Sequence, residues 1–141
     1  MPAATATNEP PHEAYRERLP PDCPPADAVA LSRQTVLRLV PNEAVCLDDF
    51  KSQAALGRIC PRNCDPCRWA GCSVYTENAR PEKLAYLAKL PTLSNMRFVA
   101  HVQVNEVSGK ARPGPGPEHI SVWLYASFDP CGAILRLEPL P

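Results

Sequence analysis

The sequence predicts an α+β fold: a small single domain with a mainly antiparallel or mixed sheet of about five strands and two helices. The length of 141 residues fits one domain with a modest core. Apolar residues in the C-terminal half alternate with a period of two, and two earlier segments carry helix start and stop signals. Because strands that follow one another as hairpins pair in opposite directions, the pattern favours this class over a parallel α/β sheet.

Residues 1–27 are expected to form a disordered, proline-rich arm. The chain contains 18 prolines, and many of them fall in this segment, which has few large apolar side chains. Such a segment cannot bury enough apolar surface to offset the entropy cost of ordering it. The folded domain is therefore expected over residues 28–141.

The first half of this domain is expected to contain a strand, a helix and a second strand. The run TVLRLV at 35–40 is apolar and β-branched, and a proline follows it, as at the end of a strand. The run LDDFKSQAALGR at 47–58 predicts a short helix with an aspartate as its N-cap and a glycine near its end. A cysteine-rich loop at 59–72 then leads into the run CSVYT, a short strand at 72–76.

The second half is expected to begin with a helix and to end in strands. The run ARPEKLAYLAKLP at 79–91 has a proline suited to a first helical turn, leucines on one face and a proline that prevents continuation. Apolar alternation predicts strands at 96–104, 119–128 and 133–140. Glycines and prolines interrupt residues 105–118, which are expected to form a long connection without regular structure.

Charge and hydropathy exclude several classes of partner. Fifteen basic and fifteen acidic side chains cancel, so no overall field attracts nucleic acid or an anionic membrane. The sequence has no apolar run long enough to span a bilayer, and its N-terminus lacks the basic and apolar regions of a secretory signal. We therefore expect a cytoplasmic protein with reduced thiols and a protein partner.

The run ICPRNCDPCRWAGC at 59–72 predicts a metal site. Its cysteines have the spacing C-x3-C-x2-C-x4-C, and three arginines lie in or beside it, which suits a zinc ion whose four thiolates leave a negative charge. Seven cysteines, an odd number, fit a fully paired disulfide scaffold poorly. The expected ligands are Cys60, Cys64, Cys67 and Cys72.

Other interpretations of the cysteines stay open. Most structural zinc sites draw two pairs of ligands from well-separated segments, so a distant residue could replace one member of the loop. The candidates for this replacement are Cys46, Cys131, His101 and His119. Unliganded thiols are a second interpretation, and a redox pair or disulfide is a third.

An iron–sulfur cluster is the second metal interpretation. The C-x3-C-x2-C part of the spacing resembles the cluster motif of radical S-adenosylmethionine enzymes. Those enzymes use a large partial barrel, which 141 residues cannot build. Zinc is therefore the first candidate metal.

A small enzyme is the alternative from another functional class. Arg38 lies on the first expected strand, Tyr75 or Ser73 on the second, and Glu118 or Glu106 at the ends of the long connection. This order of elements and residues resembles small ADP-ribosyltransferase-like domains, including toxin-type domains. The resemblance implies that Arg38, Tyr75 and Glu118 would form a catalytic site acting on a macromolecule.

The first hypothesis is a small cytosolic binding or regulatory module. Its cysteine-rich loop would bind a metal, with zinc as the first candidate, and would organise a surface for a protein partner.

Overall fold

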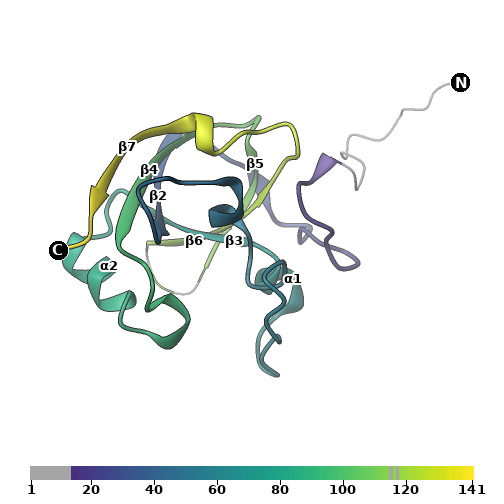
Figure 1. Cartoon of the computed structure of the whole chain (residues 1–141). Coiled ribbons are helices and arrows are strands. Elements are labelled where there is room, and N and C mark those ends of the chain that lie inside the picture. The colour runs from purple at the N-terminus through teal and green to yellow at the C-terminus, as the bar shows by residue number, and fades with distance from the viewer. Residues whose placement is uncertain (1–13, 115, 117) are drawn as a thin grey trace, which may run out of the picture.

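The computed structural model describes residues 14–114, 116 and 118–141, and its centre is a curved seven-stranded sheet (Figure 1). The strand order is β1-β5-β6-β3-β2-β4-β7, and every neighbouring pair is antiparallel. The strands are β1 Val29–Ala30, β2 Gln34–Val40, β3 Cys72–Thr76, β4 Phe98–Val104, β5 Gly109–Pro113, β6 His119–Leu124 and β7 Ile134–Pro139. The helical segments are α1 Pro66–Trp69, α2 Pro81–Leu87 and the 3-10 turns Leu47–Phe50, Pro91–Leu93 and Cys131–Ala133.

The α+β class, the antiparallel sheet and the presence of two helices are confirmed, whereas the number of strands is seven and not five. The strands expected at 35–40 and 72–76 are β2 and β3, and the apolar alternations form β4, β6 and β7. The helix expected at 79–91 is the shorter α2.

The prediction of an irregular connection at 105–118 is wrong for its middle part. Gly109–Pro113 forms β5, which pairs with β6 on one side and with β1 on the other. Gly109 makes this pairing close, because a Cβ added there would lie 2.3 Å from the carbonyl oxygen of Trp123. Pro113 is tolerated at the end of the strand. The glycine that indicated a loop is instead required by tight strand pairing.

The predicted helix at 47–58 is also wrong. The chain forms one 3-10 turn at Leu47–Phe50, becomes extended at Lys51 and then continues in turns. The backbone carbonyls of Asp49 and Lys51 accept hydrogen bonds from Arg38, so these groups are held by a tertiary contact and not by a helix.

The two faces of the sheet bury different apolar clusters. Val36 and Val40 of β2 point to the inner face, where they meet side chains of β3, β4 and β6. Leu37 and Leu39 point to the opposite face, where α2 covers them through Leu84 (Figure 1). The period of two in β2 therefore places one half of its side chains in each cluster.

The segment 14–27 packs against the sheet, although the sequence assigned it to a disordered arm; residues 1–13 lie outside the described part of the chain. The amide N–H of Arg16 donates to the carbonyl of Leu124 at 2.9 Å, and Tyr15 forms a bridge with Tyr125. Tyr15 is buried in a third cluster with Trp123. Within the described residues, no helix is long and apolar enough to cross a membrane.

Arg38 joins three segments on the inner face. Its guanidinium donates to the carbonyl oxygens of Asp49 at 3.0 Å, Ser73 at 2.7 Å and Lys51 at 3.1 Å. A half-buried cation bonded to three backbone acceptors fixes β2, β3 and the 3-10 turn relative to one another.

We expect Arg38→Met to lower the free energy of unfolding by about 3 kcal/mol, because it keeps the aliphatic stem but leaves three carbonyls without their charged donor. Urea denaturation measures this change. The control is Arg33→Met at an exposed position near the same strand, for which we expect a change within about 0.5 kcal/mol. Equal effects of the two substitutions would contradict the role given to Arg38.

Candidate functional site

The cysteine-rich loop at 59–72 is anchored by a disulfide between Cys23 and Cys67. Cys67 lies in α1, where its N–H donates at 3.1 Å to the side chain of Asp65, the N-cap residue. The carbonyl of Cys67 accepts a hydrogen bond from the indole Nε1 of Trp123 at 3.0 Å. A covalent bond and a buried hydrogen bond therefore hold the loop on β6 and on the N-terminal segment.

The four predicted metal ligands occupy three different environments. Cys67 is oxidised, Cys72 is buried in the inner core on β3, and Cys60 and Cys64 are half-buried in the loop. In the described ranges, no group of three or more His, Cys, Asp or Glu side chains is arranged to hold a metal ion. In its disulfide form, the loop cannot supply four thiolates, so this donor set does not fit the expected zinc site.

Cys60 and Cys64 are the two predicted ligands that the fold brings together. The N–H of Cys64 donates to the carbonyl of Pro61 at 3.0 Å, which bends the chain back on itself. The Sγ atom of Cys60 lies 3.4 Å from the carbonyl oxygen of Cys64. The pKa of the Cys60 thiol is raised by desolvation, by a hydrogen bond with the Cys64 thiol and by the negative charges of Cys64 and Asp65.

The four candidate replacement ligands have other neighbours. His101 bonds to Glu138, and the His119 ring lies edge-on to the Tyr75 ring. Cys46 is exposed. Desolvation is the main cause that raises the pKa of the Cys131 thiol, and the negative charges of Asp129 and Cys46 raise it further.

The disulfide was not predicted from the sequence. Cys23 lies in the segment assigned to the arm, and no spacing rule selects it as the partner of Cys67 from the seven cysteines. A disulfide is typical of a non-reducing environment. Cytoplasmic localisation therefore stays a prediction, and this bond does not favour it.

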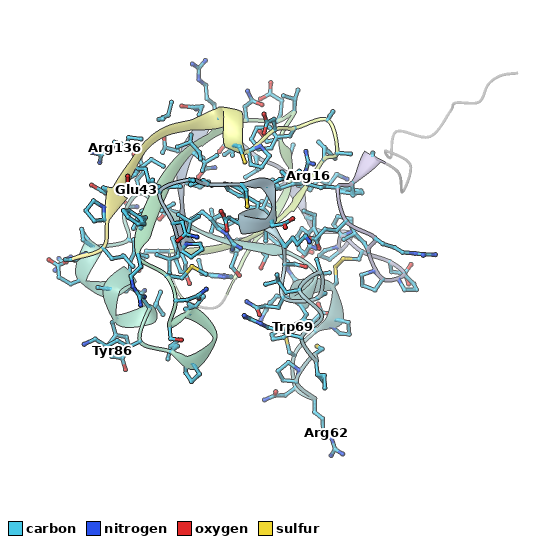
Figure 2. The ribbon with its side chains drawn as sticks, viewed as in Figure 1. Arg16, Glu43, Arg62, Trp69, Tyr86 and Arg136 are labelled. Carbon is cyan, nitrogen blue, oxygen red and sulfur yellow. A yellow bond between two sulfur atoms is a disulfide. The ribbon has the colours of Figure 1, made fainter. Side chains whose placement is uncertain are left out.

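The loop exposes apolar and basic side chains. Ile59 is 92% exposed and lies next to Arg58, while Leu56 is 47% exposed three residues earlier. The indole Nε1 of Trp69 donates to the carbonyl of Arg58 at 2.9 Å, and this hydrogen bond links the start of the loop to α1. Figure 2 shows Arg62 at the tip of the loop, pointing away from the sheet, and Trp69 closer to the body of the molecule.

The three candidate catalytic residues do not share one cavity. Arg38 and Tyr75 line the same hollow, of about 330 Å³, whereas Glu118 lines a different one and forms an ion pair with Lys83. Arg38 already donates to three carbonyls. Burial raises the pKa of the Tyr75 hydroxyl, and the charge of Arg38 opposes this rise.

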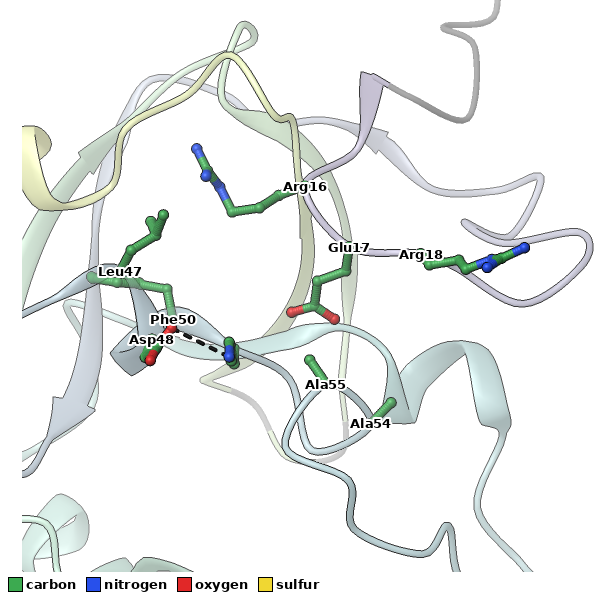
Figure 3. Close-up of a pocket in the computed structure, with 9 residues that line it drawn as sticks. Arg16, Glu17, Arg18, Leu47, Asp48, Phe50, Ala54 and Ala55 are labelled. Atoms are coloured by element: carbon green, nitrogen blue, oxygen red, sulfur yellow. Dashed lines mark ion pairs between the residues drawn. The ribbon is translucent and has the colours of Figure 1, made fainter.

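The sequence did not predict a hollow beside the N-terminal segment, because residues 16–18, which line part of it, were assigned to the disordered arm (Figure 3). Its volume is about 460 Å³. The Glu17 carboxylate accepts from the N–H of Ser52 at 2.9 Å, and Lys51 pairs with Asp48 at 3.3 Å. The charged side chains that line this hollow are Arg16, Glu17, Arg18, Asp48 and Lys51.

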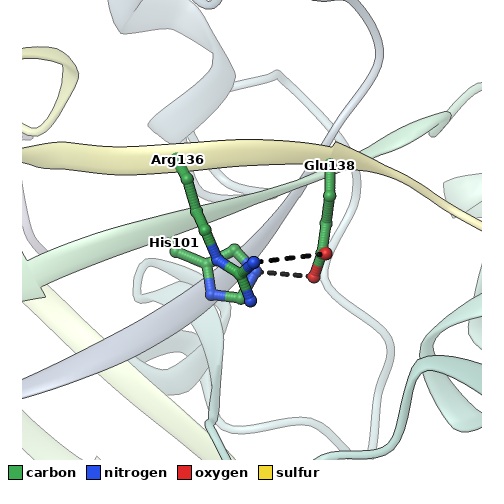
Figure 4. Close-up of polar contacts among 3 residues, drawn as sticks. All are labelled: His101, Arg136 and Glu138. Atoms are coloured by element: carbon green, nitrogen blue, oxygen red, sulfur yellow. Dashed lines mark hydrogen bonds and ion pairs between the residues drawn. The ribbon is translucent and has the colours of Figure 1, made fainter.

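A group of polar side chains spans the neighbouring strands β4 and β7 (Figure 4). The Nε2 atom of His101 lies 2.7 Å from a carboxylate oxygen of Glu138, and Arg136 lies 3.8 Å from the other oxygen. The hydrogen bond with His101 is the main cause that lowers the pKa of Glu138. These residues line a hollow of about 440 Å³ with an apolar floor.

Comparisons with protein-family models, with curated proteins and with solved structures give no match for this chain.

We expect loss of the Cys23–Cys67 disulfide to lower the free energy of unfolding by about 3–4 kcal/mol, because the bond closes a loop with a sequence separation of 44 residues. Denaturation of Cys23→Ser under non-reducing conditions measures the loss. The control Cys46→Ser removes an exposed free cysteine and is expected to change the value by less than about 0.5 kcal/mol. An unfolding curve of the unsubstituted chain that does not respond to reductant would contradict this prediction.

The lowered pKa of Glu138 predicts a specific pH dependence. The carboxylate contributes stability above its ordinary pKa of 4.5, and this contribution is lost as the pH falls through the lower pKa of the folded state. We expect Glu138→Gln to be less stable by about 0.5 kcal/mol at pH 7, since the group is partly exposed, and equal to the unsubstituted chain below the folded pKa. Thermal unfolding between pH 7 and 3 tests this, with exposed Glu106→Gln as control. A stability gap that stays constant over this range would refute the linkage.

Proposed function

We propose that this chain is a binding module that docks a protein partner through its cysteine-rich loop and does not itself catalyse a reaction. The observation that carries the proposal is Ile59, a large apolar side chain that is 92% exposed on an anchored loop. Ile59 is followed within the same loop by arginines, and arginine is enriched at protein interfaces.

The anchoring of the loop supports this role. A loop that is already ordered loses less conformational entropy when it binds, so more of the contact energy appears as affinity. Disulfide bonding of Cys67, the hydrogen bond from Trp69 to Arg58 and the hydrogen bond from Arg58 to the side chain of Gln53 all restrict the loop before any partner arrives.

Leu56 adds to the apolar surface. It is partly exposed and lies on the turn that leads into the loop, where Arg58 follows. Together Leu56, Arg58, Ile59 and Arg62 form a docking face, defined here by these four residues. These four exposed residues combine two apolar side chains with two arginines, which suits a partner surface that carries apolar and acidic groups.

The enzyme hypothesis has less support. An ADP-ribosyltransferase-like site needs its arginine, its tyrosine and its glutamate to converge on one substrate. The guanidinium of Arg38 is already bonded to backbone carbonyls, and Glu118 lines a separate hollow.

A metal remains a proposal for the reduced chain alone. After reduction, the Cys67 thiol would be free to join Cys60 and Cys64, with zinc as the first candidate and an iron–sulfur cluster as the second. A bound metal would then hold the loop in place of the disulfide, and the docking face would keep its role.

We expect a photo-crosslinking side chain at position 59 to capture a discrete protein from an extract of the source cells. Excess unlabelled chain should compete with this capture, whereas Ile59→Asp should compete about tenfold less well, because one central apolar contact is removed. The yield of the adduct on denaturing gels, as a function of competitor, measures the difference.

The matched control is the same crosslinker at Val107, which is 64% exposed on the turn between β4 and β5. Ile59→Asp should unfold at the same urea concentration as the unsubstituted chain, since the side chain is exposed. Equal capture at the two positions, or equal competition by Ile59→Asp, would overturn the docking role.

A further inference from the structure

Two cysteines lie on one turn of the loop and have no role in the core. Cys60 and Cys64 are half-buried, and neither belongs to a buried apolar cluster, in contrast to Cys72. The hydrogen bond from the Cys64 N–H to the carbonyl of Pro61 closes a turn between them. This turn brings the Cys60 Sγ atom to 3.4 Å from the Cys64 carbonyl oxygen and to 3.5 Å from that of Pro61. The Cys64 Sγ atom lies 3.6 Å from the carbonyl oxygen of Asp65 in the same turn.

We propose that Cys60 and Cys64 are a redox-active thiol pair that closes to a second disulfide within the loop. The oxidant is a small-molecule disulfide of the glutathione class. One cysteine of the pair loses its proton, and its thiolate attacks a sulfur of that disulfide and releases one small thiolate. The second cysteine, as thiolate, attacks the mixed disulfide and releases the other small thiolate. Two protein thiols are oxidised, and one small disulfide is reduced to two thiols.

The surroundings favour closure over pairing with other cysteines. Cys67 is already bonded to Cys23, and Cys72 is buried on β3. Because the turn has gathered the two thiols in advance, the second attack is intramolecular and loses little chain entropy. The pair is also accessible to a small oxidant, since both residues are partly exposed.

The proposed oxidation of Cys60 and Cys64 does not rest on the proposed docking function, because it is argued from the turn that holds the two cysteines. A disulfide between Cys60 and Cys64 would join the residues on the two sides of Arg62, which belongs to the docking face. A failure of docking would leave the chemistry of the pair intact, and the mass measurement below does not depend on a partner.

The sequence provides a direct test by peptide mapping. The folded, full-length chain is incubated with glutathione disulfide, its free thiols are alkylated, and it is digested with trypsin without reduction. Cleavage after Arg58, Arg62 and Arg68 separates Cys60 from Cys64. We expect one species that joins three peptides, namely 19–33, 59–62 and 63–68.

A second cleavage assigns the pairing within this species. Asp65–Pro66 is an acid-labile bond that lies between Cys64 and Cys67. After mild acid treatment, we expect peptide 59–62 to remain linked to 63–65, and 66–68 to remain linked to 19–33. Recovery of 59–62 in alkylated or glutathionylated form, or linked to 66–68, would overturn the proposal.

Matched variants separate this chemistry from unfolding. In Cys60→Ser, we expect Cys64 to be recovered alkylated or as its unresolved mixed disulfide with glutathione, while 63–68 stays linked to 19–33, which also reports that the loop is still folded. Cys46→Ser, at an exposed cysteine outside the loop, should leave the three-peptide species unchanged. Loss of that species in Cys46→Ser would assign the link to another cysteine and refute the pair.

Discussion

The bond between Cys23 and Cys67 is the constraint on which the surface features of this protein depend. It fixes the N-terminal segment to α1, and α1 in turn positions the loop that precedes it. Around the bond, Tyr15, Trp123 and Leu19 complete a small apolar cluster outside the main core. Without this covalent link, the segment 14–27 would be held to the sheet by few apolar contacts, because it is short and rich in proline.

Arg38 has a comparable role on the inner face, but through hydrogen bonds. It lies between Val36 and Val40 in a position that the strand pattern would otherwise fill with an apolar side chain. Its bonds to three carbonyls replace the helix that the sequence predicts after β2, since two of these acceptors belong to residues 49–51. A half-buried guanidinium that donates to three carbonyls from different segments favours one arrangement of the surrounding chain. The catalytic interpretation of Arg38 and its structural interpretation therefore compete for the same N–H groups.

The cysteines divide according to environment and not according to spacing. The motif C-x3-C-x2-C-x4-C suggests one site, but the structure places its members in three different environments. Cys72 is a buried apolar residue, Cys67 is half of a long-range disulfide, and Cys60 and Cys64 are neighbouring thiols. Spacing within a loop reports only that residues are close in the chain, whereas ligand convergence depends on the direction of each side chain and on competing partners such as Cys23. The proposals for docking and for thiol oxidation both concern the part of the loop that remains accessible.

By itself, the sequence determined the α+β class and the position of most strands. The apolar and β-branched residues of β2, β4 and β6 predict strands locally, and both faces of these strands are largely buried in the structure. The tertiary structure alone decided the rest. Strand β5 forms because it pairs with both β1 and β6. The expected helix at 47–58 does not form, and the guanidinium of Arg38 instead binds a backbone carbonyl of this segment. The partner of Cys67 lies in a segment that is not close to it in sequence. These outcomes depend on contacts between residues far apart in the chain, and no local pattern of residues contains that information.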